Sequence, residues 1–403
     1  MRAKDDASKA TMQDIPVVVV GGGAIGLAVA LGLAQAGVPV VLAGAAETVH
    51  DDGRTAALMQ PSIATFGRLG VLERLKEKSW PLAAIRLVDI TGALVRSPTV
   101  TFRASEIGHD YFALNFSNAD IVREMTAALR AEPNATVLTA RVTDVGIGPE
   151  AVALTLSDGQ SLRCALAVAA DGQKSPLREA AGIGTRRWPY DQVALTFHVT
   201  HPKDHEDIST EFHTRAGPLT YVPYGPFKSS VVWLVTHAEA KRLMALPPQE
   251  VARACQRMSS SLLGDLTIVG GVGAVPMGAM IARTAAANRI ALAGEALHAF
   301  PPVGAQGMNL GLRDADNLLD AIIPALRRGE DPGSAAALAP YERGRQVDAV
   351  SRTYGVDMLN RSLISGLLPV DLARFAGLTA AATFGPLRRA LMRAGMGQSP
   401  FAA

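Results

Sequence analysis

The chain has 403 residues, of which 48% are hydrophobic and 19% are charged, and its 38 glycines and 24 prolines are spread along its length. These values are typical of a globular protein of two or three domains, and they exclude a disordered, collagen-like or coiled-coil chain. The formal net charge is only +2, so no strong field would attract nucleic acid, and we expect no nucleic-acid partner. Neither Cys164 nor Cys255 has the spacing of a metal ligand or a CxxC motif. We therefore expect no metal site, no disulfide and a reducing, cytoplasmic environment.

Residues 15–46 contain neither a charged residue nor a histidine, which on length alone would suggest a transmembrane helix. Glycines and a proline divide this run into a valine-rich strand at 16–20, a glycine turn, a helix ending at residue 36 and a second strand at 38–42. Residues 1–14 mix both charge signs and lead into no cleavage-site pattern, so we expect a flexible tail rather than a signal peptide. The pattern predicts a βαβ unit at the N-terminus.

The glycine turn has the spacing GxGxxG. Gly21 allows a tight turn, Gly23 lets the backbone approach a pyrophosphate, and Gly26 permits close helix packing. The helix N-terminus adds N–H donors and a positive dipole. Because the motif lies between a strand and a helix, it indicates a dinucleotide site better than a lone glycine-rich turn does. The candidate phosphate-binding residues are Gly21, Gly23, Ala24, Ile25 and Gly26.

The acidic residue that usually ends the second strand and binds the adenosine ribose is missing. That strand ends in Leu42-Ala43-Gly44, and Glu47 is the nearest carboxylate. We expect ribose binding to be weaker, or to be made through the backbone and Glu47.

Three later segments favour FAD over NAD. Arg54 comes just after the second strand, where a guanidinium can pair with a pyrophosphate, although alone it would more often be a solvated surface residue. Asp171-Gly172 ends one apolar strand and Gly294-Glu295 ends another, and a loop rich in proline and glycine follows the second. The candidate cofactor residues in these segments are Arg54, Asp171, Gly172, Gly294, Glu295, Gly304, Gln306, Gly307, Met308 and Asn309.

The order of these motifs resembles that of the flavin-dependent aromatic hydroxylases of the para-hydroxybenzoate hydroxylase type, and most closely the ubiquinone-biosynthesis hydroxylases among them. The likeness covers nearly the whole chain. Residues 52–58 are similar to the arginine motif of that branch, and residues 341–348 and 377–397 are similar to its C-terminal part. Asn118 matches an amide residue at that family's cofactor. Two positions depart from the pattern: Glu295 replaces the aspartate that holds the flavin ribitol, and residues 301–307 are closer to the para-hydroxybenzoate hydroxylase form.

The resemblance implies an α/β fold with a Rossmann-like FAD-binding domain, an antiparallel β-sheet substrate domain and a C-terminal helical region. We expect the FAD-binding domain at 15–80, 112–184 and 281–339, the substrate domain at 81–111 and 185–280, and the helical region at 340–403. In this family NAD(P)H reduces FAD, oxygen adds at the flavin C4a position, and the hydroperoxide transfers one oxygen atom to an electron-rich ring. Residues 270–275 lack a following helix, so we expect NAD(P)H as a transient co-substrate, with Asp171 serving both nucleotides.

The candidate catalytic residues lie around the proline-rich loop. Pro301-Pro302 would aim the next helix N-terminus at the flavin pyrimidine, which favours the negative charge of reduced flavin. His298 is a candidate general base, with a packed, structural histidine as the alternative.

The middle of the chain predicts antiparallel strands at 191–199, 209–213, 219–222 and 229–236, separated by Gly/Pro turns. Alternation places one set of large side chains on one face, where they would form an apolar wall for an aromatic substrate. The alternative is that they form only the core face of the sheet. These residues are Phe212, Leu219, Tyr221, Pro223 and Trp233.

The leading interpretation is an NAD(P)H- and FAD-dependent monooxygenase that hydroxylates a small aromatic compound, a polyprenylated phenol of ubiquinone biosynthesis. The alternatives are a hydroxylase of a soluble aromatic compound and a non-catalytic flavin-fold assembly factor of a quinone-synthesis complex. In the C-terminal region arginines punctuate apolar residues, as in helices that contact the inner face of a membrane or a partner. Packing on the FAD domain, or on a sister subunit in a homo-oligomer, is the alternative there.

Overall fold

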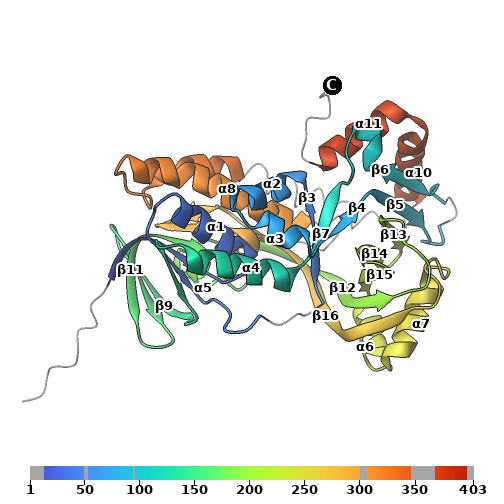
Figure 1. The fold of residues 1–403 in the computed structure, drawn as a ribbon, viewed down its shortest axis with the longest axis horizontal. Coiled ribbons are helices and arrows are strands. Elements are labelled where there is room, and N and C mark those ends of the chain that lie inside the picture. The colour runs from blue at the N-terminus through green and yellow to red at the C-terminus, as the bar shows by residue number, and fades with distance from the viewer. Residues whose placement is uncertain (1–12, 50–52, 94–95, 300–305, 346–367, 397–403) are drawn as a thin grey trace, which may run out of the picture.

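Two eight-stranded sheets, with a three-stranded sheet between them, form the frame of the computed structural model (Figure 1). The structure describes residues 13–49, 53–93, 96–299, 306–345 and 368–396. The expected α/β class, with one mainly parallel and one mainly antiparallel sheet, is confirmed.

The first sheet carries the N-terminal βαβ unit. Its order is β17-β18-β11-β1-β2-β8, with β10 and β9 added in antiparallel fashion beside β11. From β18 to β8 all pairings are parallel, which suits strands that are buried on both faces, such as the valine run of β1. The strands are β1 (Gln13–Val20), β2 (Val40–Ala43), β8 (Ala135–Leu138), β9 (Val142–Ile147), β10 (Val152–Leu156), β11 (Ser161–Ala169), β17 (Ala286–Ala287) and β18 (Ile290–Leu292).

Helices complete the core around this sheet. The central helix α1 packs against both α4 and α8, and their apolar faces share one cluster of buried residues with β1, β2 and β11. The helices are α1 (Ala24–Gln35), α4 (Asn118–Ala131), the short α5 (Pro176–Ala180) and α8 (Gln306–Arg327). A further helix covers residues 335–345.

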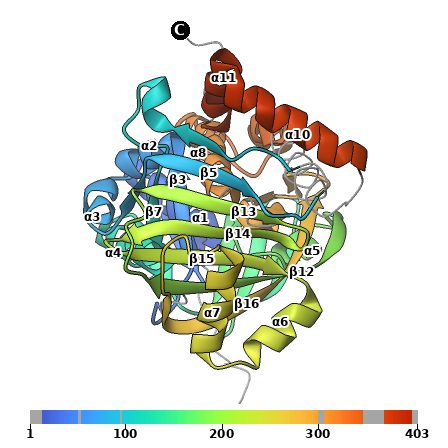
Figure 2. The same ribbon diagram turned by 90° about the vertical axis from the view of Figure 1, so that its right-hand side faces the viewer.

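The second sheet is built mainly from the middle of the chain, in the order β19-β16-β12-β15-β14-β13-β5-β6. Helices α6 and α7 pack on part of its outer face, beside β12 and β16, and Figure 2 shows the sheet from that side. All four strands expected between residues 191 and 236 are present. The elements are β5 (Ala84–Asp89), β6 (Val100–Arg103), β12 (Thr185–Thr200), β13 (Ile208–Thr214), β14 (Gly217–Gly225), β15 (Lys228–Val235), β16 (Thr267–Ala282), β19 (His298–Ala299), α6 (His237–Met244) and α7 (Pro248–Met258).

The third sheet joins the two larger ones. Its order is β3-β7-β4, and β4 and β7 contact β14 of the second sheet while β3 contacts α8. Its elements are β3 (Thr55–Met59), β4 (Trp80–Leu82) and β7 (Ala113–Ser117), and α2 (Gln60–Arg68) and α3 (Leu72–Lys76) follow β3.

The C-terminal helices α10 (Leu368–Thr383) and α11 (Gly385–Gly395) lie beside β5 and β6 (Figures 1 and 2). Arg215 forms an ion pair of 2.8 Å with the buried Asp371 of α10, and Arg388 of α11 pairs with Glu106 at 2.7 Å. In the described ranges, no helix has both the length and the hydropathy that a membrane crossing requires.

The domain boundaries expected from the sequence stay predictions. Three details of the fold differ from the residue ranges expected above. Strand β1 begins at Gln13, so Asp14 is part of the strand and pairs with Arg163 at 2.9 Å, whereas residues 1–12 of the expected tail lie outside the described residues. Strand β19 belongs to the second sheet, although the expected boundary assigns it to the FAD-binding domain. The first helix ends at Gln35, and the strand after it begins only at Val40.

Candidate cofactor and substrate site

The glycine turn between β1 and α1 is so tightly packed that three of its glycines, Gly21, Gly22 and Gly26, leave no room for a side chain. Gly21 has φ +119°, and a Cβ there would lie 2.1 Å from the carbonyl oxygen of Ala170. A Cβ on Gly26 would lie 2.0 Å from the carbonyl oxygen of Gly21. Gly23 is different, because a Cβ there meets no protein atom within 4 Å. The backbone at Gly23 therefore borders open space at the N-terminus of α1, where a pyrophosphate can approach.

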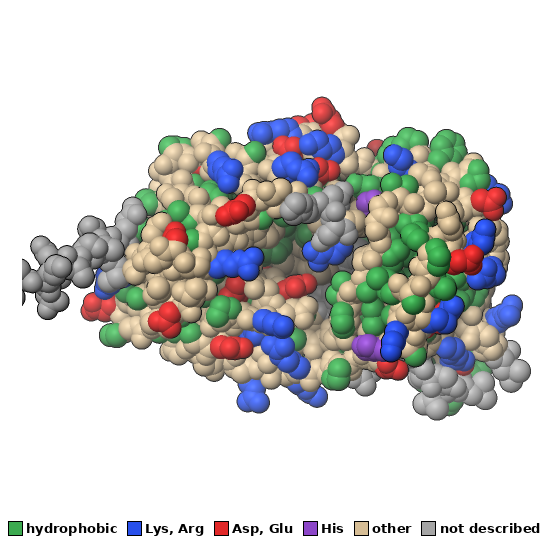
Figure 3. Space-filling view, turned by 90° about the horizontal axis from the view of Figure 1, so that it is seen from below, with side chains coloured by type: hydrophobic (Ala, Val, Ile, Leu, Met, Phe, Trp, Pro, Cys, Tyr) green, Lys and Arg blue, Asp and Glu red, His purple; other side chains and the backbone are tan. Residues whose placement is uncertain are grey.

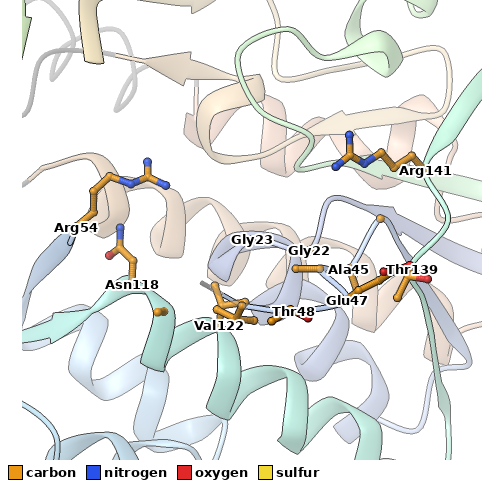
Figure 4. Close-up of a pocket in the computed structure, with 14 residues that line it drawn as sticks. Gly22, Gly23, Ala45, Glu47, Thr48, Arg54, Asn118, Val122, Thr139 and Arg141 are labelled. Atoms are coloured by element: carbon orange, nitrogen blue, oxygen red, sulfur yellow. The ribbon is translucent and has the colours of Figure 1, made fainter. Parts of the chain in front are cut away.

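A groove of about 670 Å³ opens at this turn (Figure 4). In the close-up, Arg54 and Asn118 lie toward one end, while Glu47, Thr139 and Arg141 lie toward the other. Figure 3 shows the molecule from below, hollowed between its two main parts, with basic and acidic side chains around the hollow. The lining residues are Gly22, Gly23, Gly44, Ala45, Ala46, Glu47, Thr48, Val49, Arg54, Asn118, Ala119, Val122, Thr139 and Arg141.

The end of β2 offers no side chain for a ribose. Ala43 is fully buried, and Gly44 has φ +82°, so a larger residue at position 44 would be strained. Glu47 lies in the groove, as the sequence suggested. The sequence analysis did not identify Thr139 and Arg141 as groove residues. They lie almost a hundred positions after β2 in the sequence, and only the pairing of β2 with β8 brings them to this groove.

Two buried oxygens near the groove have no hydrogen-bond partner among the described residues. They are Oδ1 of Asn118, at the start of α4, and Oδ1 of Asp171, just after β11. Burial raises the pKa of Asp171, although hydrogen bonds from Ser175 and the Leu177 backbone oppose that shift. Buried polar atoms are normally paired, so these oxygens fit a site whose ligand supplies donors such as hydroxyl groups. The turn, the groove and these acceptors together fit a dinucleotide.

The segment that contains Gly294 and Glu295 lies at the end of β18, close to α1. Gly294 has φ +61° and packs against Ile25, and Glu295 is exposed. His298 is 2% exposed, and its Nε2–H donates to Oδ2 of Asp314 at 2.7 Å. This position favours the structural alternative for His298, and a catalytic role stays a prediction.

Helix α8 follows the proline-rich loop. Pro301, Pro302 and Gly304 lie outside the described residues, and Gln306 is described only as the first residue of α8. A Cβ on Gly307 would meet nothing within 4 Å, and Met308 is half-buried against the main core. Asn309 is buried, and its amide makes three hydrogen bonds, donating to the Ala57 carbonyl and accepting from the Met59 backbone N–H and from the Ser62 hydroxyl. These contacts dock α8 on β3 and α2, a role that the sequence did not suggest.

The large side chains proposed for the substrate wall lie on the outer face of the second sheet, toward α6 and α7. Phe212, Leu219, Tyr221 and Trp233 are buried in the core between the sheet and helices α6 and α7. The Tyr221 hydroxyl donates to Ser259 Oγ at 2.8 Å, beyond the end of α7. Alternation puts Pro223 on this face as well. The predicted alternation of these side chains is present. The face that carries them is a core face, which was the alternative interpretation, because the amphipathic α7 packs on it.

The opposite face of the sheet is turned toward the first and third sheets. Ser230 contacts the hydroxyl of Thr55 in β3 at 2.8 Å, and Val222 packs against the third sheet. On this face one row of neighbouring, half-buried residues crosses four strands. The sequence analysis did not identify these residues, because their side chains are smaller and more polar than those proposed for the substrate wall. This inner row is Thr196 of β12, Val232 of β15, Thr220 of β14 and Glu211 of β13.

Comparisons with known proteins agree with this geometry. Residues 14–351 match the model of the FAD binding domain family. The chain is 34% identical to a ubiquinone hydroxylase, UbiL, of Rhodospirillum rubrum over 94% of this chain and 89% of that protein. It is 28% identical to the 3-demethoxyubiquinol 3-hydroxylase of Escherichia coli over 96% of this chain and 100% of that protein.

Among solved structures, p-nitrophenol 4-monooxygenase PnpA of Pseudomonas putida has the same fold. Its TM-score is 0.81 at 21% identity, over 96% of this chain and 99% of that chain. The two hydroxylase relatives support a catalytic flavoprotein rather than an assembly factor. The chain belongs to the FAD-dependent aromatic hydroxylases, in the branch of the ubiquinone-biosynthesis hydroxylases.

Proposed function

We propose that this FAD-dependent hydroxylase adds one oxygen atom to the ring of a polyprenylated phenol in ubiquinone biosynthesis. The observation that carries the proposal is the 34% identity to a ubiquinone hydroxylase over 94% of the chain. Hydroxylation of a soluble aromatic compound is the second candidate. The likeness to p-nitrophenol 4-monooxygenase supports only the fold, and it does not favour that candidate.

FAD supplies the redox and oxygen chemistry when it is bound, and NAD(P)H is the reducing co-substrate. We assign its pyrophosphate to the backbone at Gly23 and the N-terminus of α1, and Arg54 lies in the same groove to balance the phosphate charge. Asn118 and Asp171 would accept hydrogen bonds from cofactor hydroxyl groups. Glu47 and Arg141 would hold the adenosine end, in place of the missing carboxylate at the end of β2.

The inner row would face the aromatic ring. Thr196, Val232 and Thr220 have small, half-buried side chains, and we assign the aromatic ring to the face of the sheet that they form. Glu211 at the end of the row bonds to Nε2 of His213 at 2.8 Å, so the polar end of this surface is ordered. A mixed surface of this kind suits a phenol, because it can contact both the apolar ring and its hydroxyl.

The prenyl chain of such a substrate is embedded in lipid, and α10 and α11 offer a surface for membrane contact. Leu372, Phe384, Leu387 and Leu391 are between 38% and 58% exposed there. Arg389 is exposed beside them. Apolar residues flanked by arginines are typical of helices that lie on an anionic membrane. We therefore extend the proposal to peripheral membrane contact through α10 and α11.

Flotation with anionic liposomes tests this contact. Wild-type protein should float with the vesicles, and Phe384→Ser with Leu391→Ser should remain at the bottom of the gradient. Equal flotation of both proteins, or none by either, would refute the contact.

The substrate proposal is tested in a strain that lacks the gene. Mass spectrometry should detect a prenylated quinone precursor that lacks one hydroxyl group, and the wild-type gene should remove that precursor. An unchanged quinone profile would contradict this proposal and favour a soluble aromatic substrate.

A further inference from the structure

A buried carboxylate on α8 holds the segment that leads into the proline-rich loop. Asp314 is fully buried, and its Oδ2 accepts hydrogen bonds from the Gly294 backbone N–H at 2.8 Å and from His298 Nε2–H at 2.7 Å. Its Oδ1 lies 2.7 Å from a guanidinium nitrogen of Arg345, whose side chain is also fully buried. One carboxylate thus joins the turn at 294–296, β19 and helix 335–345.

The charges of this cluster explain how its members are held together. A buried carboxylate is costly unless it is paired, and Arg345 supplies the opposite charge. Because Arg345 engages Oδ1, the other oxygen remains for Gly294 and His298. Hydrogen bonds to a charged acceptor are stronger than neutral ones, so Asp314 fixes both the Gly294 N–H and the ring of His298. Any displacement of α8 must therefore displace both groups.

The two bonded groups border the expected flavin site. Glu295, which would hold the flavin ribitol, directly follows Gly294, and His298 lies three residues after Glu295. Asn309 fixes the first turn of α8 to β3. Helix α8 is thus held near its start by Asn309, and Asp314, further along the same helix, holds Gly294 and His298.

We propose that Asp314 is a positioning residue for the flavin, and that it acts through Gly294 and His298 rather than by touching the cofactor. It sets where Glu295 stands relative to the flavin. This inference rests on the FAD-dependent activity of the same site, but it does not depend on which aromatic compound is the substrate.

Three variants test the proposal in full-length protein, with FAD affinity and the circular dichroism of bound flavin as the readouts. His298→Leu removes the donor to Asp314, and the FAD dissociation constant should rise about tenfold, with an altered flavin signal. In His298→Gln a side-chain N–H can again reach Asp314, so most of the affinity and the wild-type signal should return. Asp314→Asn should weaken FAD binding at least as much as His298→Leu.

The control variant changes a contact of the same helix 335–345 that is made to neither Gly294 nor His298. Glu342 accepts hydrogen bonds from the backbone N–H groups of Ala285 and Ala286 at 2.5 and 2.9 Å. Glu342→Gln should lower the thermal midpoint of the protein while the FAD dissociation constant stays within about twofold of wild type.

Wild-type affinity and an unchanged flavin signal in folded His298→Leu would overturn the proposal, even if Asp314→Asn does not fold. The same conclusion follows if Glu342→Gln weakens FAD binding as much as His298→Leu does, or if His298→Gln rescues nothing. These measurements need no aromatic substrate, so their failure is distinguishable from failure of the substrate proposal.

Discussion

Asn309 donates its side-chain amide to the carbonyl of Ala57 at 2.9 Å, across 252 positions of sequence. With Met59 and Ser62 it forms one connection between α8 and the β3–α2 unit, beside the bonds of Asp316 to Thr65 and Arg68. Helix α8 also packs on α1, so this amide links the site of the phosphate turn to the third sheet.

Replacing Asn309 by leucine should destabilise the protein by about 2–4 kcal/mol, because three buried groups lose their partner at once. Urea unfolding of the apoprotein measures the effect. Asn134→Ala is the control, since it removes one partly buried hydrogen bond of 3.3 Å to Ala34 and should cost less than about 1 kcal/mol. Equal losses in the two variants would show that Asn309 has no special role.

The phosphate turn offers a test that separates binding from folding. Gly23→Ala places a methyl group where no protein atom lies within 4 Å, so apoprotein stability should not change. The same methyl group would occupy the space of the pyrophosphate, and FAD affinity should fall about tenfold or more.

Gly26→Ala is the matched comparison, because its Cβ would lie 2.0 Å from the Gly21 carbonyl oxygen. It should lower both the urea midpoint of the apoprotein and the affinity for FAD. If Gly23→Ala bound FAD as tightly as wild type, the pyrophosphate would not lie at this turn.

Val231 and Val232 are neighbours in β15 that face opposite sides of the second sheet. Val232→Phe would extend a half-buried side chain of the inner row, so the KM for the aromatic substrate should rise about tenfold with little loss of stability. Val231 is 1% exposed in the core against α6 and α7, so Val231→Phe should cost about 1–3 kcal/mol by overpacking and leave KM unchanged. Steady-state kinetics and urea unfolding of both variants measure this, and the reverse pattern would return the substrate to the face that carries Trp233.

The turn after β5 should be sensitive to acid through Asp89, which also lies 3.5 Å from Arg374 of α10. Burial alone would raise the pKa of Asp89, but hydrogen bonds from Thr91 and Ser97 and the nearby Arg374 outweigh it and lower the pKa to about 2. A carboxylate whose pKa is lower in the folded protein than the ordinary 3.8 stabilises the fold fully above pH 4, and this contribution is lost as the pH falls toward 2.

The lowered pKa of Asp89 corresponds to a contribution of about 2 kcal/mol to the free energy of unfolding. Urea unfolding between pH 6 and pH 3 should show wild-type protein losing part of this stability. Asp89→Asn should be less stable at pH 6 and should show a smaller dependence on pH over this range. Parallel pH profiles for the two proteins would contradict the assignment.

The N-terminal unit was predictable because local spacing encodes it. The glycines, the valine strand and the apolar helix lie within thirty residues or so, and their positions follow from short-range sterics. The groove partners Thr139 and Arg141 were not predictable, since they reach it only through the β2–β8 pairing.

The second sheet shows a different limit. Alternation correctly grouped Leu219 with Tyr221, but a strand pattern does not say which face meets a helix and which meets a ligand. Large apolar residues were assigned to the ligand face, whereas the structure uses them to bind α7. For His298, the missing information was Asp314, which lies two turns into α8 and engages the ring nitrogen.

Hydroxylation of a prenylated phenol is tested most directly by mass spectrometry of the product. FAD-loaded protein is incubated with a prenylated phenol, NAD(P)H and isotopically labelled O2. We expect a product that carries one additional oxygen atom derived from O2, together with substrate-stimulated NAD(P)H oxidation. NAD(P)H oxidation that no phenol stimulates, with only unmodified phenol recovered, would contradict it.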